Sequence, residues 1–318
     1  MTFTSKVLIT GGAGFIGSNL ADGLIQQGAR VVIIDNFTTG FRENLEEIEG
    51  NFDFIEGDIN DDAAVKKAVE GCEVIFHQAA LPSVPRSVEN PEETHRVCVN
   101  GTLNLLIKAR EAGVRRVIYA ASSSAYGNQP TLPKVETMRP DPLSPYAVAK
   151  LTGEHYCRAF YSVYGLETFS LRYFNVFGPR QNPSSMYSGV ISRFIDALMT
   201  GQQPVIYGDG EHSRDFTYIA NVVDANIKAA QATRGIGETI NVANGDRFTL
   251  NALLDVLKTI TNTPGAVVDY QPPRSGDVRD SQADNKRATV WLGYTQLVGL
   301  EEGLKNTIDW WKASRFAK

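Results

Sequence analysis

A glycine-rich segment near the N-terminus limits what this chain can fold into more than any other feature. Residues 7–10 form a short apolar run typical of a buried strand, and Gly11-Gly12-Ala13-Gly14-Phe15-Ile16-Gly17 follows at once. A helical pattern then runs to about Gln27, and a second apolar run at 31–34 ends on Asp35. A strand, a glycine turn, a helix, a strand and an acid in this order are typical of a dinucleotide-binding unit.

The glycines and the acid indicate which dinucleotide the unit would bind. The backbone at Gly11, Gly14 and Gly17 can approach a pyrophosphate, whose charge is stabilised by the free N–H groups of a helix N-terminus. The same segment also fits G-x-G-x-x-G through Gly12. Asp35 lies 18 residues beyond Gly17, where its carboxylate can accept hydrogen bonds from the adenosine ribose. Because a carboxylate would repel a 2′-phosphate, we expect NAD rather than NADP.

Strands and helices alternate after this unit, which predicts a parallel sheet covered by helices on both faces. Residues 82–91 contain three prolines, and we expect them to form a loop beyond the carboxyl end of a strand, where open parallel sheets bind ligands. The predicted fold is α/β, a Rossmann-like doubly wound parallel sheet. Further strands are expected at 52–55, 74–77, 117–120 and 168–172, and helices at 63–69, 92–112 and from Pro145 onward.

The pattern changes after Gly178-Pro179, where segments become shorter and turns more frequent. We predict an NAD-binding domain at residues 1–178 and a smaller α/β substrate-binding domain at 179–318, of which parts near 213–243 pack back on the first. In this second part we expect helices near 190–198, 221–231, 250–261 and 300–312, and short strands near 204–207 and 240–242.

Composition and charge argue against several other classes of protein. The chain has 318 residues and a net charge of −5 without a block of like charge, which disfavours a nucleic-acid-binding surface. Cys72, Cys98 and Cys157 form neither a metal-binding nor a disulfide pattern, as expected in a reducing cytoplasm. No apolar run approaches the roughly 18 residues that span a bilayer, and no signal-peptide layout is present. We therefore expect a cytoplasmic protein without a metal, nucleic-acid or membrane partner.

A tyrosine and a lysine four residues apart are the candidate catalytic pair. Ser144 can cap a helix that begins at Pro145, and that helix places Tyr146 and Lys150 on one face. Half-ionising a tyrosine at neutral pH requires lowering its pKa by about 3 units, or about 4 kcal/mol. One positive charge about 4 Å away supplies about that much. Taken alone, the pair would more often be a packed ring beside an extended lysine; the rest of the chain favours catalysis.

Several separate motifs resemble those of the extended short-chain dehydrogenase/reductase family, and within it the nucleotide-sugar 4-epimerases. The likeness covers nearly the whole chain and is strongest to the UDP-N-acetylglucosamine 4-epimerases. Besides Tyr146 and Lys150, the segments that carry it are residues 10–17, 77–80, 83–87, 100–102, 122–124, 171–179, 214–216 and 274–278.

The resemblance implies that the chain uses NAD to epimerise UDP-sugars at C4. Tyr146 would take the proton from the sugar O4 while hydride leaves C4 for NAD, and return of the hydride to the other face of the 4-keto sugar would invert C4 without net redox change. Ser122 aligns best with the family hydroxyl that bonds O4, and Ser124 is the alternative because the serine triplet leaves this choice partly open. Lys150 would also hold the nicotinamide ribose.

The same resemblance assigns binding residues position by position. Arg214 and Arg274 would clamp the substrate diphosphate, for which a bidentate guanidinium is suited, although each arginine taken alone would more often form a surface ion pair. His95, His155 and His212 show no partner pattern, and we expect them to be structural or exposed. The expected cofactor contacts are Gly11, Gly14, Phe15, Ile16, Gly17, Asp35, Asn36, Asp58, Ile59, Ala79, Ala80, Asn100, Tyr146, Lys150 and Tyr173. The expected substrate contacts are Ser124, Asn175, Val190, Tyr207, Arg214, Arg274, Asp277 and Ser281.

One small residue bears on which sugars are accepted. Ser281 falls where these epimerases have a gate beside the sugar 2-substituent, and a small residue there admits an N-acetyl group that a large aromatic residue would exclude. We therefore expect UDP-GlcNAc and UDP-GalNAc as substrates, with UDP-glucose and UDP-galactose as a second pair. The alternative is that Ser281 is an ordinary polar loop residue.

Other functions on the same fold stay open at this point. Nucleotide-sugar 4,6-dehydratases carry an Asp-Glu pair just after the catalytic hydroxyl, where this chain has Ser123 and Ser124. A UDP-glucuronate 4-epimerase or decarboxylase would bind the sugar carboxylate through arginines such as Arg86 or Arg180. A non-catalytic NAD-binding scaffold is the third alternative, although such proteins commonly lose the tyrosine or the lysine. The resemblance also implies a homodimer that pairs through the helix at 92–112 and the Tyr146 helix.

Overall fold

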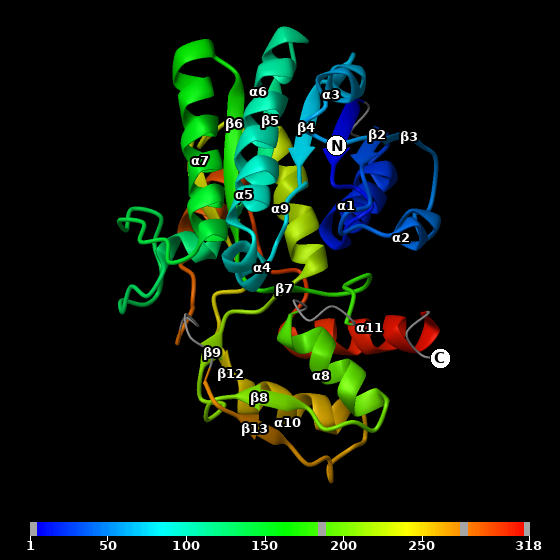
Figure 1. The fold of residues 1–318 in the computed structure, drawn as a ribbon, viewed down its shortest axis with the longest axis vertical. Helices are drawn as coiled ribbons and strands as arrows, with labels where there is room; N and C mark the ends of the chain where they lie inside the picture. Colours follow the sequence, from blue (N-terminus) through cyan, green and yellow to red (C-terminus); the bar gives the residue numbers. More distant parts are fainter. Residues whose placement is uncertain (1–4, 184–188, 274–278, 315–318) are drawn as a thin grey trace.

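A seven-stranded parallel sheet forms the centre of the larger lobe (Figure 1). We describe it from a computed structural model, which covers residues 5–183, 189–273 and 279–314. The strand order is β11-β6-β5-β4-β1-β2-β3. From β1 the chain adds β2 and β3 on one side, and it then returns to add β4, β5, β6 and β11 on the other side. The direction in which strands are added therefore changes between β1 and β4. The strands are β1 (Lys6–Thr10), β2 (Arg30–Asp35), β3 (Phe52–Glu56), β4 (Val74–His77), β5 (Arg116–Ser122), β6 (Glu167–Tyr173) and β11 (Thr239–Val242).

Alternate residues of each strand are buried on opposite faces of the sheet. Ile9 and Ile33 pack in one core with α1 (Phe15–Gln26) and α9 (Ile219–Gln231). Leu8 and Val32, which are paired across β1 and β2, pack in a second core on the other face. Because both faces are covered, the strands read as nearly continuous apolar runs. The expected doubly wound α/β fold is confirmed. The second core is built with α3 (Asp62–Val69), α6 (Gly101–Glu111) and α7 (Pro145–Tyr164).

Two segments next to β4 differ from the expectation. Residues 82–91 were expected to be a loop, but Val84–Glu89 form a short helix, α4, because Ser83 Oγ accepts a hydrogen bond from the N–H of Arg86 and proline is tolerated in a first turn. The helix expected at 92–112 is interrupted: α5 (Pro91–His95) and α6 are joined by a π-helical turn, η1 (Arg96–Asn100). Such turns occur often at functional sites.

In the described residues, the smaller lobe contains short paired strands and the helices α8, α10 and α11 (Figure 1). Between these elements of the smaller lobe, the chain returns to the larger lobe, where α9 packs against α1 and β11 pairs with β6. The pairs are β7 (Val176–Phe177) with β10 (Thr217–Tyr218), β8 (Val205–Tyr207) with β13 (Asp269–Gln271), and β9 (Ser213–Arg214) with β12 (Phe248–Thr249). The helices are α8 (Val190–Met199), α10 (Leu250–Ile260) and α11 (Leu300–Ala313), and the remaining short elements are α2 (Arg42–Glu46), η2 (Ser123–Tyr126) and η3 (Ala288–Leu292).

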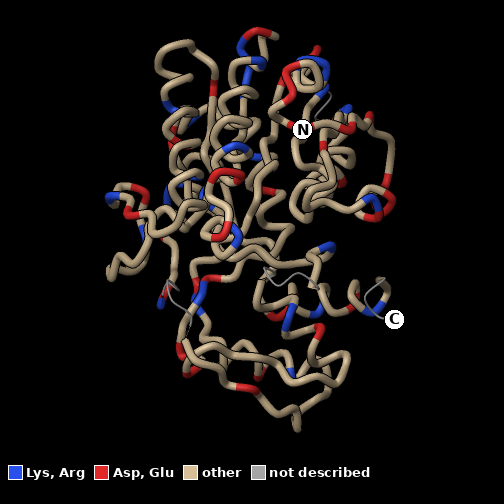
Figure 2. The backbone as a smooth tube through the Cα atoms, in the orientation of Figure 1, with Lys and Arg blue, Asp and Glu red and all other residues tan. Residues whose placement is uncertain are grey.

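Charged residues are distributed over the whole of the described backbone (Figure 2). Basic and acidic residues are interspersed along both lobes (Figure 2). In the part of the chain that the structure describes, no helix combines the length and apolar character needed to cross a bilayer. Within the same residues, no three histidine, cysteine or acidic side chains gather as metal ligands would.

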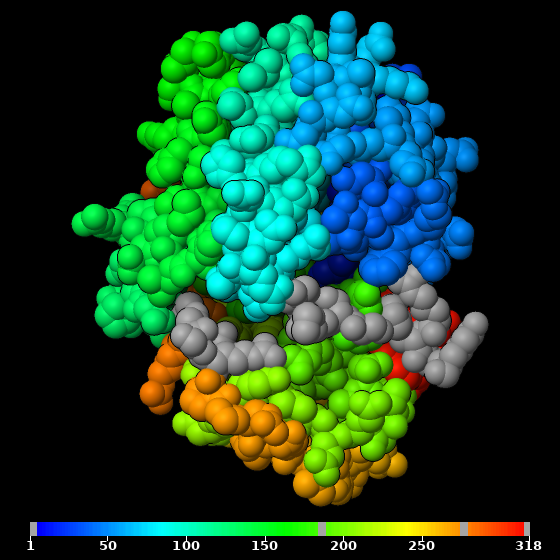
Figure 3. Space-filling model, in the orientation of Figure 1, coloured from blue at the N-terminus to red at the C-terminus, as the bar shows by residue number. Residues whose placement is uncertain are grey.

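In the space-filling view, residues of α4 to α6 (cyan) lie between the N-terminal region and α7 (Figure 3).

Candidate active site

The residues expected to hold the cofactor meet at the carboxyl edge of the sheet, where the glycine turn follows β1. Gly11 has a φ of +71°, and a Cβ there would lie 2.7 Å from the backbone of Ala79. A Cβ on Gly17 would lie 2.2 Å from the carbonyl oxygen of Gly11. A Cβ on Gly14 would meet only that oxygen, at 3.1 Å, and would otherwise stand in open space. The turn is therefore packed on its inner side and open on the side where a ligand would lie.

The start of α1 is suited to an anion. Gly14 is its N-cap residue, no side chain caps the helix, and its first turn, which includes Phe15 and Ile16, contains no acidic residue. The exposed N–H groups and the helix dipole therefore favour a negatively charged group at this position. A pyrophosphate fits both this end of the helix and the open face of the glycine turn.

Asp35, at the end of β2, both shapes the turn and presents a carboxylate. Its Oδ2 accepts a hydrogen bond from the N–H of Ala13 at 3.0 Å, and its Oδ1 accepts one from Phe37 at 2.8 Å. Burial raises the pKa of Asp35, and these backbone hydrogen bonds oppose the rise. A carboxylate oxygen has more than one lone pair, so the group can still accept from ribose hydroxyls. The residues present therefore fit NAD.

Asp58, which was expected at the adenine rim, lies beside Asn36. Its Oδ2 accepts from Asn36 Nδ2 at 3.2 Å and from Arg96 at 3.3 Å, and its Oδ1 accepts from the N–H of Asn60 at 2.8 Å. Burial opposes ionisation of Asp58, but these donors lower its pKa overall. Asp58 is therefore an ionised, oriented acceptor at neutral pH.

The other expected cofactor positions differ in their burial. Ile59 is buried against Gly101, while Ala79 and Ala80 are half-buried just after β4. Asn100 is exposed at the last position of η1. The phenol of Tyr173 belongs to an internal network, in which it accepts from Asn226 Nδ2 at 2.8 Å. Its side chain is thus a structural group here, and only its backbone is available to a cofactor.

Ser122 and Tyr146 meet between the end of β5 and the start of α7. Ser144 caps α7 by accepting from the N–H of Ala147 at 3.2 Å, and Tyr146 lies in the first turn. Ser122 lies close enough to the phenol of Tyr146 to lower its pKa. Ser124 Oγ donates to Ser122 Oγ at 2.8 Å. The hydroxyl groups of Ser122, Ser124 and Tyr146 therefore gather at the end of β5.

Lys150 is buried one turn further along α7. Its ammonium donates to the carbonyl oxygen of Ala120 at 2.8 Å and lies 5.0 Å from the centroid of the Tyr119 ring. The hydroxyl of Tyr119 donates to the carbonyl oxygen of Lys150 at 3.2 Å, which ties α7 to β5. Burial lowers the pKa of Lys150 because it penalises the charged form.

Burial dominates the electrostatics of Tyr146. It raises the pKa of the phenol above the ordinary tyrosine value, and Ser122 lowers the pKa only in part. The Lys150 ammonium donates to Ala120 in this geometry. The expected ionisation of the phenol counts on the positive charge of an oxidised nicotinamide as well as on Lys150, and it stays a prediction.

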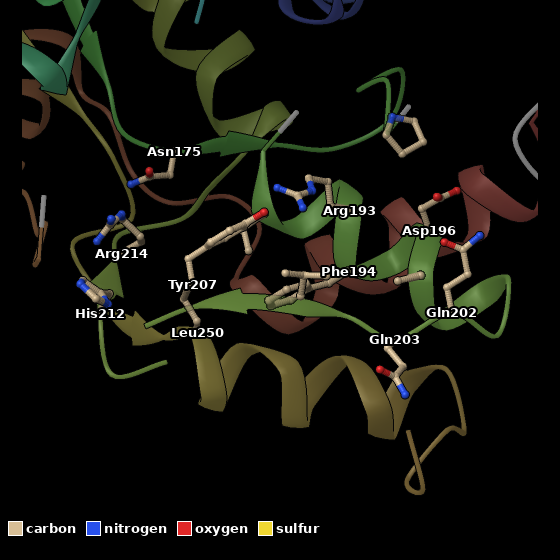
Figure 4. Close-up of a pocket in the computed structure, with 14 residues that line it drawn as sticks. Asn175, Arg193, Phe194, Asp196, Gln202, Gln203, Tyr207, His212, Arg214 and Leu250 are labelled. Atoms are coloured by element: carbon tan, nitrogen blue, oxygen red, sulfur yellow. The ribbon is translucent and has the colours of Figure 1, made fainter. Parts of the chain in front are cut away.

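A cavity of about 350 Å³ lies in the smaller lobe next to this region (Figure 4). It is lined by four of the expected substrate contacts: Asn175, Val190, Tyr207 and Arg214. Ser281 adjoins them, since Asn175 Nδ2 donates to its Oγ at 3.3 Å. The expected contacts Arg274 and Asp277 lie outside the described residues.

The cavity also contains residues that the sequence analysis did not identify. Arg193 lies three residues after Val190 on α8, a spacing that places both on one helix face and could have revealed it. Its guanidinium carbon lies 6.0 Å from the centroid of the Tyr207 ring. His212 was expected to be structural or exposed, but it lines the cavity with a side chain 23% exposed, because the 208–210 turn brings it beside β9. The other lining residues are Pro183, Phe194, Asp196, Ala197, Gln202, Gln203, Val205 and Leu250.

Asp215, the residue after Arg214, is a buried acid that joins several backbone segments. Its buried carboxylate accepts from the backbone N–H groups of Asn244, Gly245 and Ala283 at 3.0, 3.0 and 3.1 Å. Burial raises the pKa of Asp215 to about 7, and these hydrogen bonds oppose the rise. Asp215 thereby joins three segments that are distant in the sequence, next to Arg214.

Comparisons with known proteins agree with this geometry. Residues 7–243 match the model of the NAD dependent epimerase/dehydratase family. The UDP-glucose 4-epimerase of Mycolicibacterium smegmatis is 39% identical over 311 residues, which cover 96% of this chain and 98% of that protein. The Thermotoga maritima UDP-glucose 4-epimerase, solved with UDP-glucose, is 39% identical and superimposes with a TM-score of 0.92 over 97% of this chain and 99% of that one. The Methanobrevibacter ruminantium UDP-N-acetylglucosamine 4-epimerase, solved with UDP-N-acetylmuramic acid, is 38% identical, with a TM-score of 0.90 over 97% and 98%.

Proposed function

This chain belongs to the NAD dependent epimerase/dehydratase family, and we propose that it is a UDP-hexose 4-epimerase. It interconverts UDP-GlcNAc with UDP-GalNAc, and UDP-glucose with UDP-galactose. The observation that carries this proposal is the cluster of Ser124, Ser122 and Tyr146 hydroxyl groups at the carboxyl end of β5, the same edge of the parallel sheet at which the glycine turn follows β1. The names of the similar enzymes support the UDP-hexose class.

Tyr146 moves the proton of the reaction. As an ionised phenol it takes the proton from the sugar O4, and it gives the proton back when the inverted alcohol forms. Bound NAD would supply the hydride acceptor and donor for C4, together with a positive charge near the phenol. Because burial raises the pKa of the Tyr146 phenol, we expect ionisation only in the loaded enzyme. Ser122 donates to the same sugar oxygen and is itself oriented by Ser124.

The larger lobe orients the cofactor through residues that the fold brings to one edge. The open face of the glycine turn and the start of α1 would hold the pyrophosphate, and Asp35 would accept from the adenosine ribose. Lys150 would hold the nicotinamide ribose, which requires its ammonium to exchange or share its bond with the carbonyl of Ala120. Asn36, Asp58, Ile59, Ala79, Ala80, Asn100 and Tyr173 complete the proposed cofactor site.

The smaller lobe orients the substrate. Arg214 and Asn175 would bind its diphosphate, while Val190 and Tyr207 would pack against the uridine. Ser281 would lie beside the sugar 2-substituent, since its hydroxyl already accepts from Asn175. A side chain this small leaves room for an N-acetyl group. Arg274 and Asp277 keep their proposed roles in the same site.

The arrangement disfavours two alternatives. A 4,6-dehydratase needs acids next to Ser122, and Ser124 supplies only a hydroxyl that is bonded to Ser122. A glucuronate enzyme needs a cation for the sugar carboxylate. Arg180 is unsuited, since its Nη1 lies 2.7 Å from Asp22 and its Nε donates to Glu47 at 3.1 Å. Of the two arginines considered for this role, only Arg86 is left to bind the sugar carboxylate in a glucuronate enzyme.

We also propose that the protein works as a homodimer in the cytoplasm. Val148, Val163 and Tyr164 are exposed apolar residues of α7, which is the helix that family likeness places in a dimer interface. Cys72, Cys98 and Cys157 are free buried thiols, which fits a reducing compartment. Sedimentation at micromolar concentration tests the dimer, and a monomer there would count against it.

A product assay tests the main proposal. The purified protein is incubated with UDP-GlcNAc, UDP-glucose or UDP-glucuronate, and the products are identified by NMR. We expect 4-epimers of the first two and no product from the third. Tyr146→Phe should lower turnover by at least about 10²-fold with NAD still bound, because the proton acceptor is lost. An unchanged turnover in Tyr146→Phe would refute the mechanism, and turnover of UDP-glucuronate alone would replace the substrate class.

A further inference from the structure

Arg193 is a cation of the substrate cavity for which the described part of the chain provides no acidic partner. It is half-buried on α8, and Asp196 follows it by three residues, yet the two form no ion pair. Figure 4 shows the reason, since the guanidinium of Arg193 points toward Tyr207 and away from Asp196. The buried arginines of the described residues differ from it, because each pairs with an acid: Arg116 with Glu167, Arg172 with Glu154 and Arg180 with Asp22. A structural role of that kind does not account for Arg193.

Tyr207 lies between Arg193 and the residues proposed to bind the diphosphate (Figure 4). Arg214 and Asn175 are on one side of its ring. Arg193 is on the other side, with its guanidinium carbon 6.0 Å from the ring centroid. Val190, which lies on the same face of α8 as Arg193, and Tyr207 are the residues proposed to pack against the base. With the diphosphate beside Arg214, Arg193 is therefore at the end of the cavity that the base would occupy.

A guanidinium at this end distinguishes between pyrimidine bases. The edge of a pyrimidine that is farthest from its diphosphate carries the substituent at C4. In uracil and thymine this substituent is a carbonyl oxygen, which accepts hydrogen bonds, whereas in cytosine it is an amino group, which donates them. A guanidinium has only donors. Arg193 can therefore bind the carbonyl of uracil or thymine, while cytosine would place donors against donors. The Tyr207 ring supports this arrangement, because arginine packs well over aromatic faces.

We propose that Arg193 selects the nucleobase of the substrate, by donating to the carbonyl oxygen at C4 of the pyrimidine and so favouring uridine and thymidine sugar nucleotides over cytidine ones. This inference rests on the proposed function, because it takes the ligand to be a sugar nucleotide with a pyrimidine base. The other charged side chains that line the cavity have different effects. Arg214 faces the diphosphate, which all these nucleotides share. Asp196 is an acceptor and would favour the cytosine amino group if it were the residue beside the base.

Comparing UDP-glucose with CDP-glucose tests the role of Arg193, because the two ligands differ only at C4 and N3 of the base. Each ligand is titrated calorimetrically into NAD-loaded Tyr146→Phe protein, in which turnover does not disturb the measurement. The test variant adds Arg193→Gln, whose amide offers an acceptor as well as donors. The matched control adds Arg158→Gln, which removes the same charge from a side chain of α7 that is 61% exposed.

We expect UDP-glucose to bind roughly tenfold more tightly than CDP-glucose in Tyr146→Phe and in the Arg158→Gln control. This preference should largely disappear in the Arg193→Gln variant, mainly through weaker binding of UDP-glucose. If the preference stays the same in that variant, because both ligands weaken equally or neither does, the inference is overturned. Equal affinities, or tighter binding of CDP-glucose, in Tyr146→Phe would overturn it as well. In each of these cases binding of UDP-glucose leaves the proposed function standing, whereas no binding of UDP-glucose to any of the proteins would overturn the proposed function itself.

Discussion

A buried charge pair holds the catalytic helix against the sheet, and removing one partner should be costly. Arg172 in β6 and Glu154 in α7 form two hydrogen bonds, Nε to Oε1 at 2.9 Å and Nη2 to Oε2 at 2.7 Å. The two side chains are only 3% and 4% exposed. Glu154 follows Lys150 by one helical turn, so the pair fixes the segment that carries the lysine. We predict that Glu154→Gln destabilises the protein strongly.

The expected size follows from the geometry and the burial. An amide in place of the carboxylate retains the shape but leaves the Arg172 guanidinium as an uncompensated buried charge. Breaking such a pair costs about 3–5 kcal/mol. Domains are typically stable by about 5–15 kcal/mol, so this is a large fraction of the total. Adding Arg172→Met should recover part of the loss, since the double variant contains no buried charge at this position.

Urea unfolding followed by intrinsic fluorescence measures the free energy of unfolding of each variant. The matched control is Arg158→Gln, which breaks the pair between Arg158 and Glu238, also at 2.9 Å but with side chains 61% and 35% exposed. There we expect a loss below about 1 kcal/mol. If Glu154→Gln costs no more than this control, burial does not set the strength of the Glu154–Arg172 pair and the reasoning is wrong.

Three further predictions concern the turn, the core and the gate. Gly17→Ala should weaken NAD binding and cost about 1–3 kcal/mol of stability, because its Cβ would meet the Gly11 carbonyl oxygen. Gly265→Ala is the control, since its Cβ meets nothing within 4 Å. NAD affinity is measured by equilibrium dialysis and stability by urea unfolding, and equal losses in the two variants would contradict the packing argument. Burial lowers the pKa of His77 to about 3, below its unfolded value near 6.5, so stability present above pH 6.5 is lost as pH falls toward 3. Between pH 7 and 5 the protonation of His77 in the unfolded chain should lower the free energy of unfolding by about 2 kcal/mol. Urea unfolding at both pH values measures this change. If the His77→Gln variant loses as much stability as the wild type between these pH values, His77 is not the cause. Ser281→Tyr should abolish NMR-detected turnover of UDP-GlcNAc before that of UDP-glucose, and an equal loss for both would argue against the gate.

Short-range patterns predicted much of the larger lobe. The glycine turn after β1, the apolar runs of the buried strands and the alternation of strands with helices are local properties, and each appears in the structure where it was expected. The α4 helix was missed because the three prolines of residues 82–91 are typical of a loop, while Ser83 supplies a cap that only the folded backbone reveals. The π-helical turn at Arg96–Asn100 was missed because it leaves the apolar spacing of a helix almost unchanged.

The residues of the candidate site were likewise predicted from the sequence only in part. Tyr146 and Lys150 could be paired from their spacing, but the spacing does not tell where the ammonium points, and packing directs it to Ala120. His212 could not be recognised, because its place in the cavity depends on pairing of β9 with β12 and on the bridge to the segment around Asp280.

By itself, the sequence determined the fold class, the family and the residue types at the reaction centre, because helix and strand periodicity and turn chemistry act between near neighbours. Only the tertiary structure decided how those residues are charged and what surrounds them. Burial and hydrogen bonding set the pKa of Tyr146 and of Asp215, and both depend on segments that lie far apart along the chain.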